Sequence, residues 1–172
     1  GPGDVAKPAL LNGNEGDDWL YGTNADDTLI ALSGIKKVYG YGGDDTIIKT
    51  GNGIGTIEGG PGYDTISYIA HTPPGYWIYS GVRVDLGLSK DQGMNGKGID
   101  NISDVEHLIG SPFDDVLSGK PGVFNKIDGG IGNDIIEGAR EDDVDGGLGQ
   151  NDCEGGKQVR CNTQSPGEAS PR

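Results

Sequence analysis

Basic residues are scarce in this sequence of 172 residues, which holds 13 Lys and Arg against 27 Asp and Glu, for a net charge of −14. Such a chain has no basic face to meet phosphate groups, so we expect no nucleic-acid partner, and an anionic membrane surface is disfavoured for the same reason. Long apolar runs are also missing, since none approaches the roughly 20 residues that span a bilayer, and we expect no membrane span. A cation is the partner that this charge favours.

Catalytic motifs are missing as well. The only histidines are His71 and His107, and the sequence contains no H-E-x-x-H motif, no G-x-S-x-G elbow and no Ser–His–Asp order. Two cysteines alone do not make a zinc site. We therefore do not expect an enzyme, and we expect His107, which follows Glu106, to be a structural or surface residue.

Glycine is abundant, with 34 residues. Composition alone favours a disordered acidic chain, because so few apolar residues bury too little surface to fold, but the order of the residues predicts otherwise. Residues 59–67 form the nine-residue pattern G-G-x-G-x-D-x-U-x, in which U is a large apolar residue, and the pattern recurs about a dozen times. The U positions are Leu20, Leu29, Val38, Ile47, Ile57 and Ile66 in a first block, residues 13–67, and Leu117, Ile127, Ile136, Val144, Cys153 and Cys161 in a second block, residues 110–162.

Each unit predicts a tight turn followed by a short strand. Glycine permits the positive φ angles of the turn, and Thr and branched residues beside U favour a strand. Within that strand U points one way and its neighbours the other. If nine residues complete half a coil, successive strands join opposite sheets, and every U side chain lies between the sheets. The predicted fold class is all-β, a right-handed parallel β-roll, which is a solenoid of nonapeptide repeats.

Three segments lie outside the blocks. Residues 1–12 combine a Gly-Pro-Gly start, which resembles a protease scar, with a disordered lead-in, and residues 163–172 form a disordered tail. The intervening segment, residues 68–109, breaks the period: residues 71–75 predict a loop, and residues 81–88 alternate apolar and polar side chains as a half-buried strand does. The sequence leaves open whether this segment continues the roll or bulges out between two shorter rolls.

The repeats resemble the RTX (haemolysin-type calcium-binding) repeat region of secreted bacterial proteins, over about residues 13–162. The intervening segment is similar to that family too, in the V-x-V-D-L stretch from Val82 to Leu86 and in the stretch from Val105 to Ser111. The resemblance implies Ca²⁺ as the bound ion and a secreted or cell-surface location of bacterial type.

Calcium takes six to eight oxygen ligands at about 2.3–2.6 Å, and stacked turns lie roughly 4.8 Å apart, so one ion fits between two turns. The nine residues of a unit are numbered 1 to 9, so that the Asp of the pattern is at position 6 and U at position 8. The resemblance implies that the lower turn supplies the carbonyls of positions 2 and 4 and the Asp at position 6. The upper turn then supplies the carbonyls of positions 1 and 3 and its own Asp. This assigns about four ions. Their ligands are Thr23, Ala25, Asp27, Gly40, Gly42 and Asp45; then Tyr41, Gly43, Asp45, Gly59, Pro61 and Asp64; then Ser111, Phe113, Asp115, Gly129, Ile131 and Asp134; and then Gly130, Gly132, Asp134, Gly146, Leu148 and Asn151.

The opposite edge of each block has poorer residues at position 6. These are Asp18, Lys36 and Gly55 in the first block, and Asn125, then Asp142 or Asp143 depending on register, then Arg160 in the second. We expect the first of these edges to be empty or weak, with the Lys36 ammonium where a cation would go, and we expect at most a weak site on the second. Glu106 would add a carboxylate to the edge ahead of the second block.

Cys153 and Cys161 both fall on U positions of adjacent units, where they would face one another across the roll. One interpretation is a disulfide that closes the C-terminal end, as in an oxidising compartment. The other is a pair of small buried thiols. The sequence leaves both open.

These patterns predict a calcium-binding module that folds on binding several ions, since metal-binding energy becomes folding energy in a chain that cannot fold alone. We expect a monomer. A function of a different class is an extracellular adhesin, or a glycan- or protein-binding module, in which calcium is only structural. Its contact surface would come from the aromatic residues Trp19, Tyr21, Tyr76, Trp77 and Tyr79, although packing of these rings against the roll is the simpler interpretation.

Overall fold

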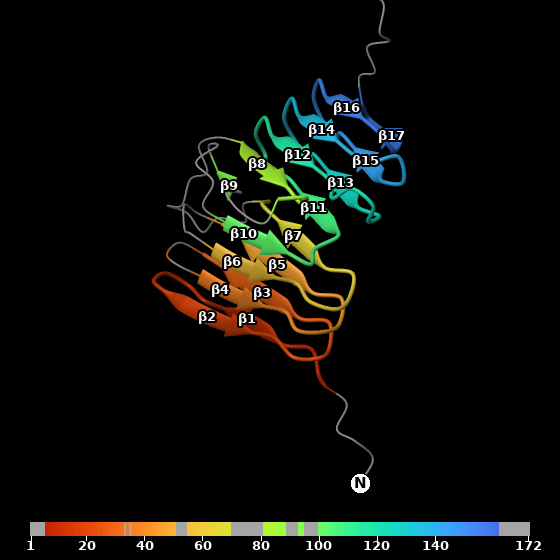
Figure 1. Ribbon diagram of the computed structural model, residues 1–172. Coiled ribbons are helices and arrows are strands. Elements are labelled where there is room, and N and C mark those ends of the chain that lie inside the picture. Colours follow the sequence, from red (N-terminus) through yellow and green to blue (C-terminus); the bar gives the residue numbers. More distant parts are fainter. Residues whose placement is uncertain are drawn as a thin grey trace, which may run out of the picture.

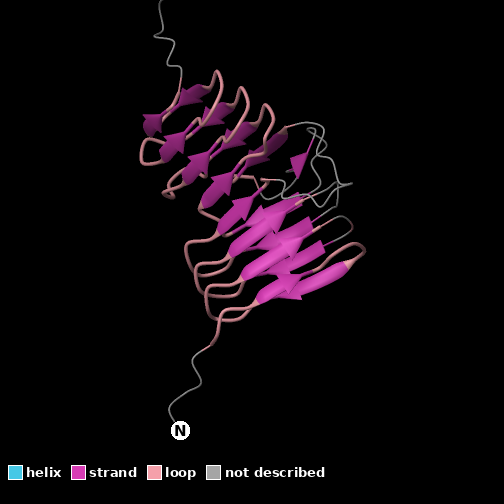
Figure 2. Cartoon of the chain, turned by 180° about the vertical axis from the view of Figure 1, so that it is seen from behind, coloured by secondary structure: helices cyan, strands magenta, loops and turns pink. Residues whose placement is uncertain are grey.

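The computed structural model describes residues 6–32, 34, 36–50, 55–69, 81–88, 93–94 and 100–161. The regular elements in these ranges are all strands, as predicted (Figure 2). Across the same ranges there is no helix of the length and apolarity that a membrane crossing requires. Several predictions lie outside the described residues: the loop at residues 71–75 with His71, the aromatic residues Tyr76, Trp77 and Tyr79, and the tail at residues 163–172.

Two layers of parallel strands face one another (Figure 1). The first sheet is 8-stranded and contains β1 (Leu10–Asn12), β3 (Thr28–Ala31), β5 (Thr46–Lys49), β7 (Thr65–Ser67), β11 (His107–Ile109), β13 (Lys126–Asp128), β15 (Asp143–Asp145) and β17 (Lys157–Val159), in that order. The second layer has a 4-stranded sheet of β2 (Asp18–Tyr21), β4 (Lys36–Tyr39), β6 (Gly55–Glu58) and β10 (Asp100–Ser103). It also has a 5-stranded sheet of β9 (Gly93–Met94), β8 (Val82–Asp85), β12 (Val116–Ser118), β14 (Ile135–Glu137) and β16 (Asp152–Glu154). In both blocks, consecutive strands alternate between the layers.

The U side chains fill the space between the layers. In the first sheet, Leu29 lies beside Ile47, and Ile47 lies beside Ile66. All three are fully buried, whereas Thr28 and Ile30 on either side of Leu29 are only half-buried. This alternation follows from the strand, in which successive side chains point to opposite faces. The predicted core positions of the two blocks are therefore confirmed, apart from the last.

The described strands of the intervening segment continue the roll. Ile102 of β10 lies beside Ile57, and Leu108 of β11 lies beside Ile66 on one side and Ile127 on the other, so the first sheet runs through both blocks without a break. The second layer is divided between β10 and β8. There β8 pairs in parallel with β12, and β9 adds an antiparallel strand to it. Both views show the β8–β9 pair at this junction, beside β12 (Figures 1 and 2).

The lead-in is shorter than predicted. Leu10–Asn12 forms β1, which pairs in parallel with β3, so residues 10–12 belong to the roll. The sequence pattern missed this strand because the residues before it lack the glycines of a nonapeptide turn. The strand covers the N-terminal end of the first sheet.

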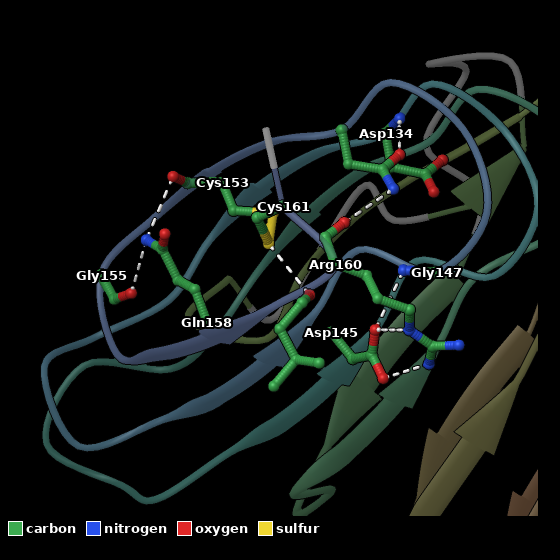
Figure 3. Close-up of a disulfide and its surroundings, with 10 residues drawn as sticks. Asp134, Asp145, Gly147, Cys153, Gly155, Gln158, Arg160 and Cys161 are labelled. Carbon is green, nitrogen blue, oxygen red and sulfur yellow. Dashed lines mark hydrogen bonds and ion pairs between the residues drawn. A yellow bond between two sulfur atoms is a disulfide. The ribbon is translucent and has the colours of Figure 1, made fainter. Parts of the chain in front are cut away.

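The last coil also differs from its prediction. In β17 Gln158, not Cys161, lies beside the core residue of β15. Only Gly155 and Gly156, with φ angles of 78° and 51°, separate β16 from β17, so this turn is shorter than a nonapeptide turn and the strand begins earlier. Cys161 follows the strand and still forms a disulfide with Cys153, with a Cα–Cα distance of 5.7 Å (Figure 3). The disulfide is thus confirmed, whereas the core position assigned to Cys161 was wrong.

Candidate metal centre

A turn precedes each strand, and the turns stack into two columns at opposite edges of the roll. We call the column before the strands of the first sheet the first edge, and the column before the strands of the second layer the second edge. The position-6 residues are Asp27, Asp45, Asp64, Glu106, Asn125 and Asp142 on the first edge, and Asp18, Lys36, Gly55, Asp100, Val82, Asp115, Asp134 and Asn151 on the second. The richer acidic column therefore lies on the first edge in the first block and on the second edge in the second block.

Hydrogen bonds along each column join successive turns. The backbone N–H of Asp27 donates to Oδ1 of Asp45 at 2.8 Å, and that of Asp45 donates to Oδ1 of Asp64 at 2.8 Å. On the second edge, the backbone N–H of Asp115 donates to Oδ1 of Asp134, and the backbone N–H of Asp134 donates to Oδ1 of Asn151, both at 2.9 Å. One side-chain oxygen of Asp45, Asp64, Asp134 and Asn151 thus ties its turn to the turn below. The three aspartates keep their second oxygen for a different partner.

The glycine at position 1 marks where that second oxygen points. At Gly40, a Cβ would overlap both Oδ2 of Asp45 and the carbonyl oxygen of Gly59 in the next turn. A position-6 oxygen of the same turn and a carbonyl oxygen of the next turn likewise crowd Gly22, Gly59, Gly110 and Gly129. Two oxygens that converge in this way repel one another unless a cation lies between them. Each such interval between turns is therefore a candidate cation site.

Several of these oxygens have no hydrogen-bond donor. Oδ2 of Asp45, Asp64 and Asp134 is buried and accepts no hydrogen bond, and each of these residues is at most 1% exposed. A buried carboxylate oxygen without a donor is unfavourable, because it has lost water and gained nothing in return. A metal ion would supply the missing partner.

The other carbonyls in the predicted ligand sets lie in the same intervals. The carbonyls of positions 2 and 4 point toward the following turn. For example, a Cβ on Gly60 would collide with the carbonyl oxygen of Tyr41 in the preceding turn, and a Cβ on Gly62 with that of Gly43. The carbonyls that point toward the following turn in this way are those of Ala25, Tyr41, Gly43, Ser111, Phe113, Gly130 and Gly132. The carbonyls of Thr23, Pro61 and Leu148 accept N–H groups of the neighbouring turn at 2.9–3.3 Å, and Gly42 and Ile131 belong to the same turns. The structure therefore brings together the residues predicted for each of the four sites.

Burial raises the pKa values of the carboxyls in these columns. It raises the pKa of Asp64 to about 6, and the charges of Asp45 and Glu106 add to the rise. Burial also raises the pKa of Asp115 to about 7, with a further contribution from Asp134. The pKa values of Asp45 and Asp134 are raised too, again mainly by burial. Without a neutralising cation, these groups retain protons more strongly than ordinary carboxyls.

Glu106 extends the first edge beyond the first block. Its Oε2 accepts the N–H of Asp64 at 3.0 Å, the bond that an Asp accepts elsewhere in the column. Asp104, with a φ of 51°, directs its carbonyl oxygen to Gly59, in place of the carbonyl of a position-1 glycine. The interval between Asp64 and Glu106 thus repeats the arrangement of the others. The sequence singled out Glu106 only as an added carboxylate and missed Asp104, because this turn is not a nonapeptide turn.

The interval between Asn125 and Asp142 is poorer. Asp142, and not Asp143, lies in the column, since its Oδ1 accepts the N–H of Asn125 at 2.7 Å. The oxygens nearest to a Cβ on Gly119 are Oδ2 of Asp142 and Oδ1 of Asn125, whereas the other intervals bring a position-6 oxygen and a backbone carbonyl oxygen to this place. Both side-chain oxygens already accept a backbone N–H, from Ala139 and Lys120 respectively, at 2.6 Å. This interval therefore offers no donor-free carboxylate oxygen of the kind found at Asp45, Asp64 and Asp134.

Arg160 does not occupy position 6, contrary to the prediction. Its guanidinium pairs with the carboxylate of Asp145, and its carbonyl oxygen accepts the side-chain amide of Asn151 at 3.3 Å (Figure 3). The short turn before β17 shifts the residue out of the column. The last coil is thus joined by an ion pair, an amide and the disulfide.

The remaining residues singled out in the sequence make contacts within the roll. His107 bonds to Oγ1 of Thr65 at 3.3 Å and to Oδ2 of Asp128 at 2.9 Å, which links β7, β11 and β13. Trp19 meets the edge of Tyr21 at a centroid distance of 6.1 Å. Tyr21 stacks on Tyr39 at 5.5 Å and on Tyr41 at 6.3 Å, and Lys37 lies over Trp19 at 4.2 Å. These rings therefore pack mainly on one another along the outer surface of the second layer.

Comparison with known proteins agrees with this geometry. The family model of the RTX calcium-binding nonapeptide repeat, built of 4 copies, matches residues 10–35, 50–67 and 109–145. No curated protein matches the chain. Across the described residues, no three His, Cys, Asp or Glu side chains gather at one point. A metal ion in these intervals would therefore draw on carboxylates together with backbone carbonyls, which are the oxygen ligands that calcium prefers. The chain therefore carries RTX calcium-binding nonapeptide repeats in the matched residues.

Proposed function

We propose that the chain binds Ca²⁺ between successive turns, at the four predicted intervals and at a fifth between Asp64 and Glu106. The observation that carries this proposal is the set of buried, donor-free oxygens of Asp45, Asp64 and Asp134, each of which faces a carbonyl oxygen of the next turn. In these intervals two position-6 side chains and several carbonyls provide enough oxygens for the six to eight ligands of calcium. The bound ion would balance carboxylate charges that otherwise repel one another.

We propose further that calcium drives folding of the roll. Each strand contributes mainly one large apolar residue to the core, as Leu29 and Ile47 do. That is little apolar burial to set against the conformational entropy of ordering nine residues. The acidic columns add repulsion in the absence of a cation. Metal binding then contributes most of the free energy that favours the folded state.

The context that fits this behaviour is a secreted or cell-surface protein. The Cys153–Cys161 disulfide persists in oxidising compartments. Calcium reaches about millimolar levels outside cells, where modules of modest affinity are filled. A chain of this kind stays unfolded where calcium is scarce and folds where calcium is plentiful.

A calcium titration followed by far-UV circular dichroism tests the proposal, with Mg²⁺ as the control ion. We expect a transition from coil to strand with Ca²⁺ only, because Mg²⁺ requires a near-ideal octahedron and retains its waters. Equilibrium dialysis would give the number of bound ions. A chain that is fully folded in chelator, and that retains no Ca²⁺ on dialysis, would contradict both parts of the proposal.

Acid should partly replace calcium. The pKa values of Asp64, about 6, and Asp115, about 7, exceed the ordinary value of 3.8, so the folded metal-free state binds more protons than the unfolded state. The stabilisation is therefore complete below about pH 3.8 and is lost as the pH rises through 6 to 7. For metal-free protein, we expect more strand signal near pH 5 than at pH 8, and a smaller difference for Asp115→Asn. Equal signals at the two pH values would show that these carboxyls do not oppose folding.

A further inference from the structure

The second edge of the first block contains buried lysines where the first edge has carboxylates. In its position-6 column Lys36 follows Asp18, and Asp100 follows Gly55. Lys36 is 0% exposed and Lys49 is 1% exposed, although lysine is among the residues most rarely buried. A buried ammonium group needs negatively polarised partners on every side, so both residues require an explanation.

Lys36 lies among oxygens of the kind that surround a metal ion. Its Nζ is 2.7 Å from Oδ2 of Asp18 and also contacts the carbonyl oxygen of Gly16. Its side chain passes over Gly13, the position-1 glycine of that turn, and a Cβ there would lie 3.4 Å from Cε of Lys36 and 3.2 Å from Oδ2 of Asp18. At Gly40 on the first edge, the corresponding place is shared by a carboxylate oxygen and a carbonyl oxygen. The ammonium group therefore occupies the interval between two turns.

Lys49 reaches the same edge from the opposite sheet. It is the last residue of β5 and the one residue inserted into the nonapeptide pattern of the first block. Its Nζ lies 3.8 Å from Oδ1 of Asp100, and both side chains are 2% exposed. Oδ2 of Asp100 accepts the hydroxyl of the buried Tyr68 at 3.4 Å. The insertion thus brings a cation to a buried carboxylate in the position-6 column.

We propose that Lys36 and Lys49 are built-in cations, whose ammonium groups hold the second edge of the first block together in place of calcium ions. The proposal rests on the proposed function, since it supposes that calcium fills the corresponding intervals elsewhere. It explains why a column with so few carboxylates still stacks in register with its neighbours. It also predicts that this edge takes up no calcium, so that the ions of the first block bind on the first edge alone.

The variant Lys36→Asp tests the proposal, because it removes the built-in cation and restores two carboxylates, with Asp18, in one interval. We expect about one more Ca²⁺ per chain than in the wild type, measured by equilibrium dialysis and native mass spectrometry. Lys37→Asp is the matched control, since it makes the same change of charge on the neighbouring, partly exposed residue, and it should bind as many ions as the wild type. A folded Lys36→Asp chain that binds no additional ion would overturn the proposal. The count for the wild type tests the proposed function separately.

A second variant covers the case in which Lys36→Asp does not fold. Lys36→Met removes the ammonium group that pairs with Asp18 and adds no carboxylate that could help to bind Ca²⁺. We therefore expect Lys36→Met to melt at a lower temperature than Lys37→Met at every calcium concentration. Excess Ca²⁺ should not restore the melting temperature. Equal melting temperatures for these two variants would overturn the proposal, because a cation that holds two turns together cannot be removed without effect.

Discussion

An Asp45→Ala chain is expected to bind two fewer calcium ions than the wild type. Asp45 is shared between two intervals of the first edge: its Oδ1 accepts the N–H of Asp27 below, and its donor-free Oδ2 faces the carbonyl of Gly59 above. Loss of a ligand should weaken calcium binding at both intervals by at least about 100-fold, since changes to outer-shell partners alone cost about 10–100-fold. Calorimetric titration would show the loss as a lower stoichiometry, and circular dichroism as a folding transition moved to higher calcium.

Asp44→Ala is the control for this variant. Asp44 precedes Asp45, is exposed, and accepts the N–H of Tyr63 in the next turn at 2.8 Å, so it joins the same two turns without a buried, donor-free oxygen. The two variants lose the same charge, so any effect of net charge on calcium binding is common to both. If Asp44→Ala and Asp45→Ala bound calcium alike, the column of buried carboxylates would not be the site.

Gly40→Ala should disrupt the same two turns without a change of charge. A Cβ at this position would collide with the carbonyl oxygen of Gly59 and with Oδ2 of Asp45. Backbone on one side and a ligand oxygen on the other cannot both move away, so the turns must separate. We expect a loss of about 1–3 kcal/mol or more in the free energy of unfolding at saturating calcium, together with weaker binding of the ion in the interval above. Thermal unfolding at several calcium concentrations measures both effects.

Gly42→Ala is the matched control for the glycine. Gly42 lies in the same turn, and a Cβ on it would have its nearest neighbours at 3.6–4.0 Å, which is ordinary contact. Neither glycine has a positive φ, so backbone strain does not distinguish them. If the two variants were equally stable, the interval above Gly40 would accommodate a methyl group without strain. The two oxygens at Gly40 would then not be held close together, and their positions would no longer indicate a bound ion.

The sequence predicted the roll and most of its core because the nonapeptide pattern repeats through the two blocks with only single-residue departures in length. Once Leu29, Ile47 and Ile66 occupy equivalent positions, register, layer and burial follow from the period of the repeat. The same regularity brought the four predicted sets of ligands together, since carbonyl direction is a property of the repeated turn. The ions themselves remain a proposal.

The features that the sequence missed lie where the repeat is irregular. Asp104, with a φ of 51°, lies in a turn that does not follow the nonapeptide pattern, so no periodicity predicted that its carbonyl oxygen would lie at Gly59. The two-glycine turn before β17 shifted the last register, and β1 lacks the preceding turn that would have marked it. Lys49 looked like a simple insertion, because its partner Asp100 lies far along the chain and becomes its neighbour only when β10 stacks on β6. In each case a contact in three dimensions decided the structure.

The hydrogen bonds that run from each turn to the carboxylate of the next make the roll a one-dimensional chain of links. Every link joins adjacent coils only, as in Asp27 to Asp45 to Asp64 to Glu106. In such an array the free energy of folding is close to the sum of what each coil contributes and what each pair of neighbouring coils contributes, and order can start in one coil and spread along the stack. Glu106 joins the two blocks, because its carboxylate accepts the N–H of Asp64 and its carbonyl oxygen accepts the N–H of Lys126 at 2.9 Å. A fold that begins in one block can therefore spread through Glu106 into the other.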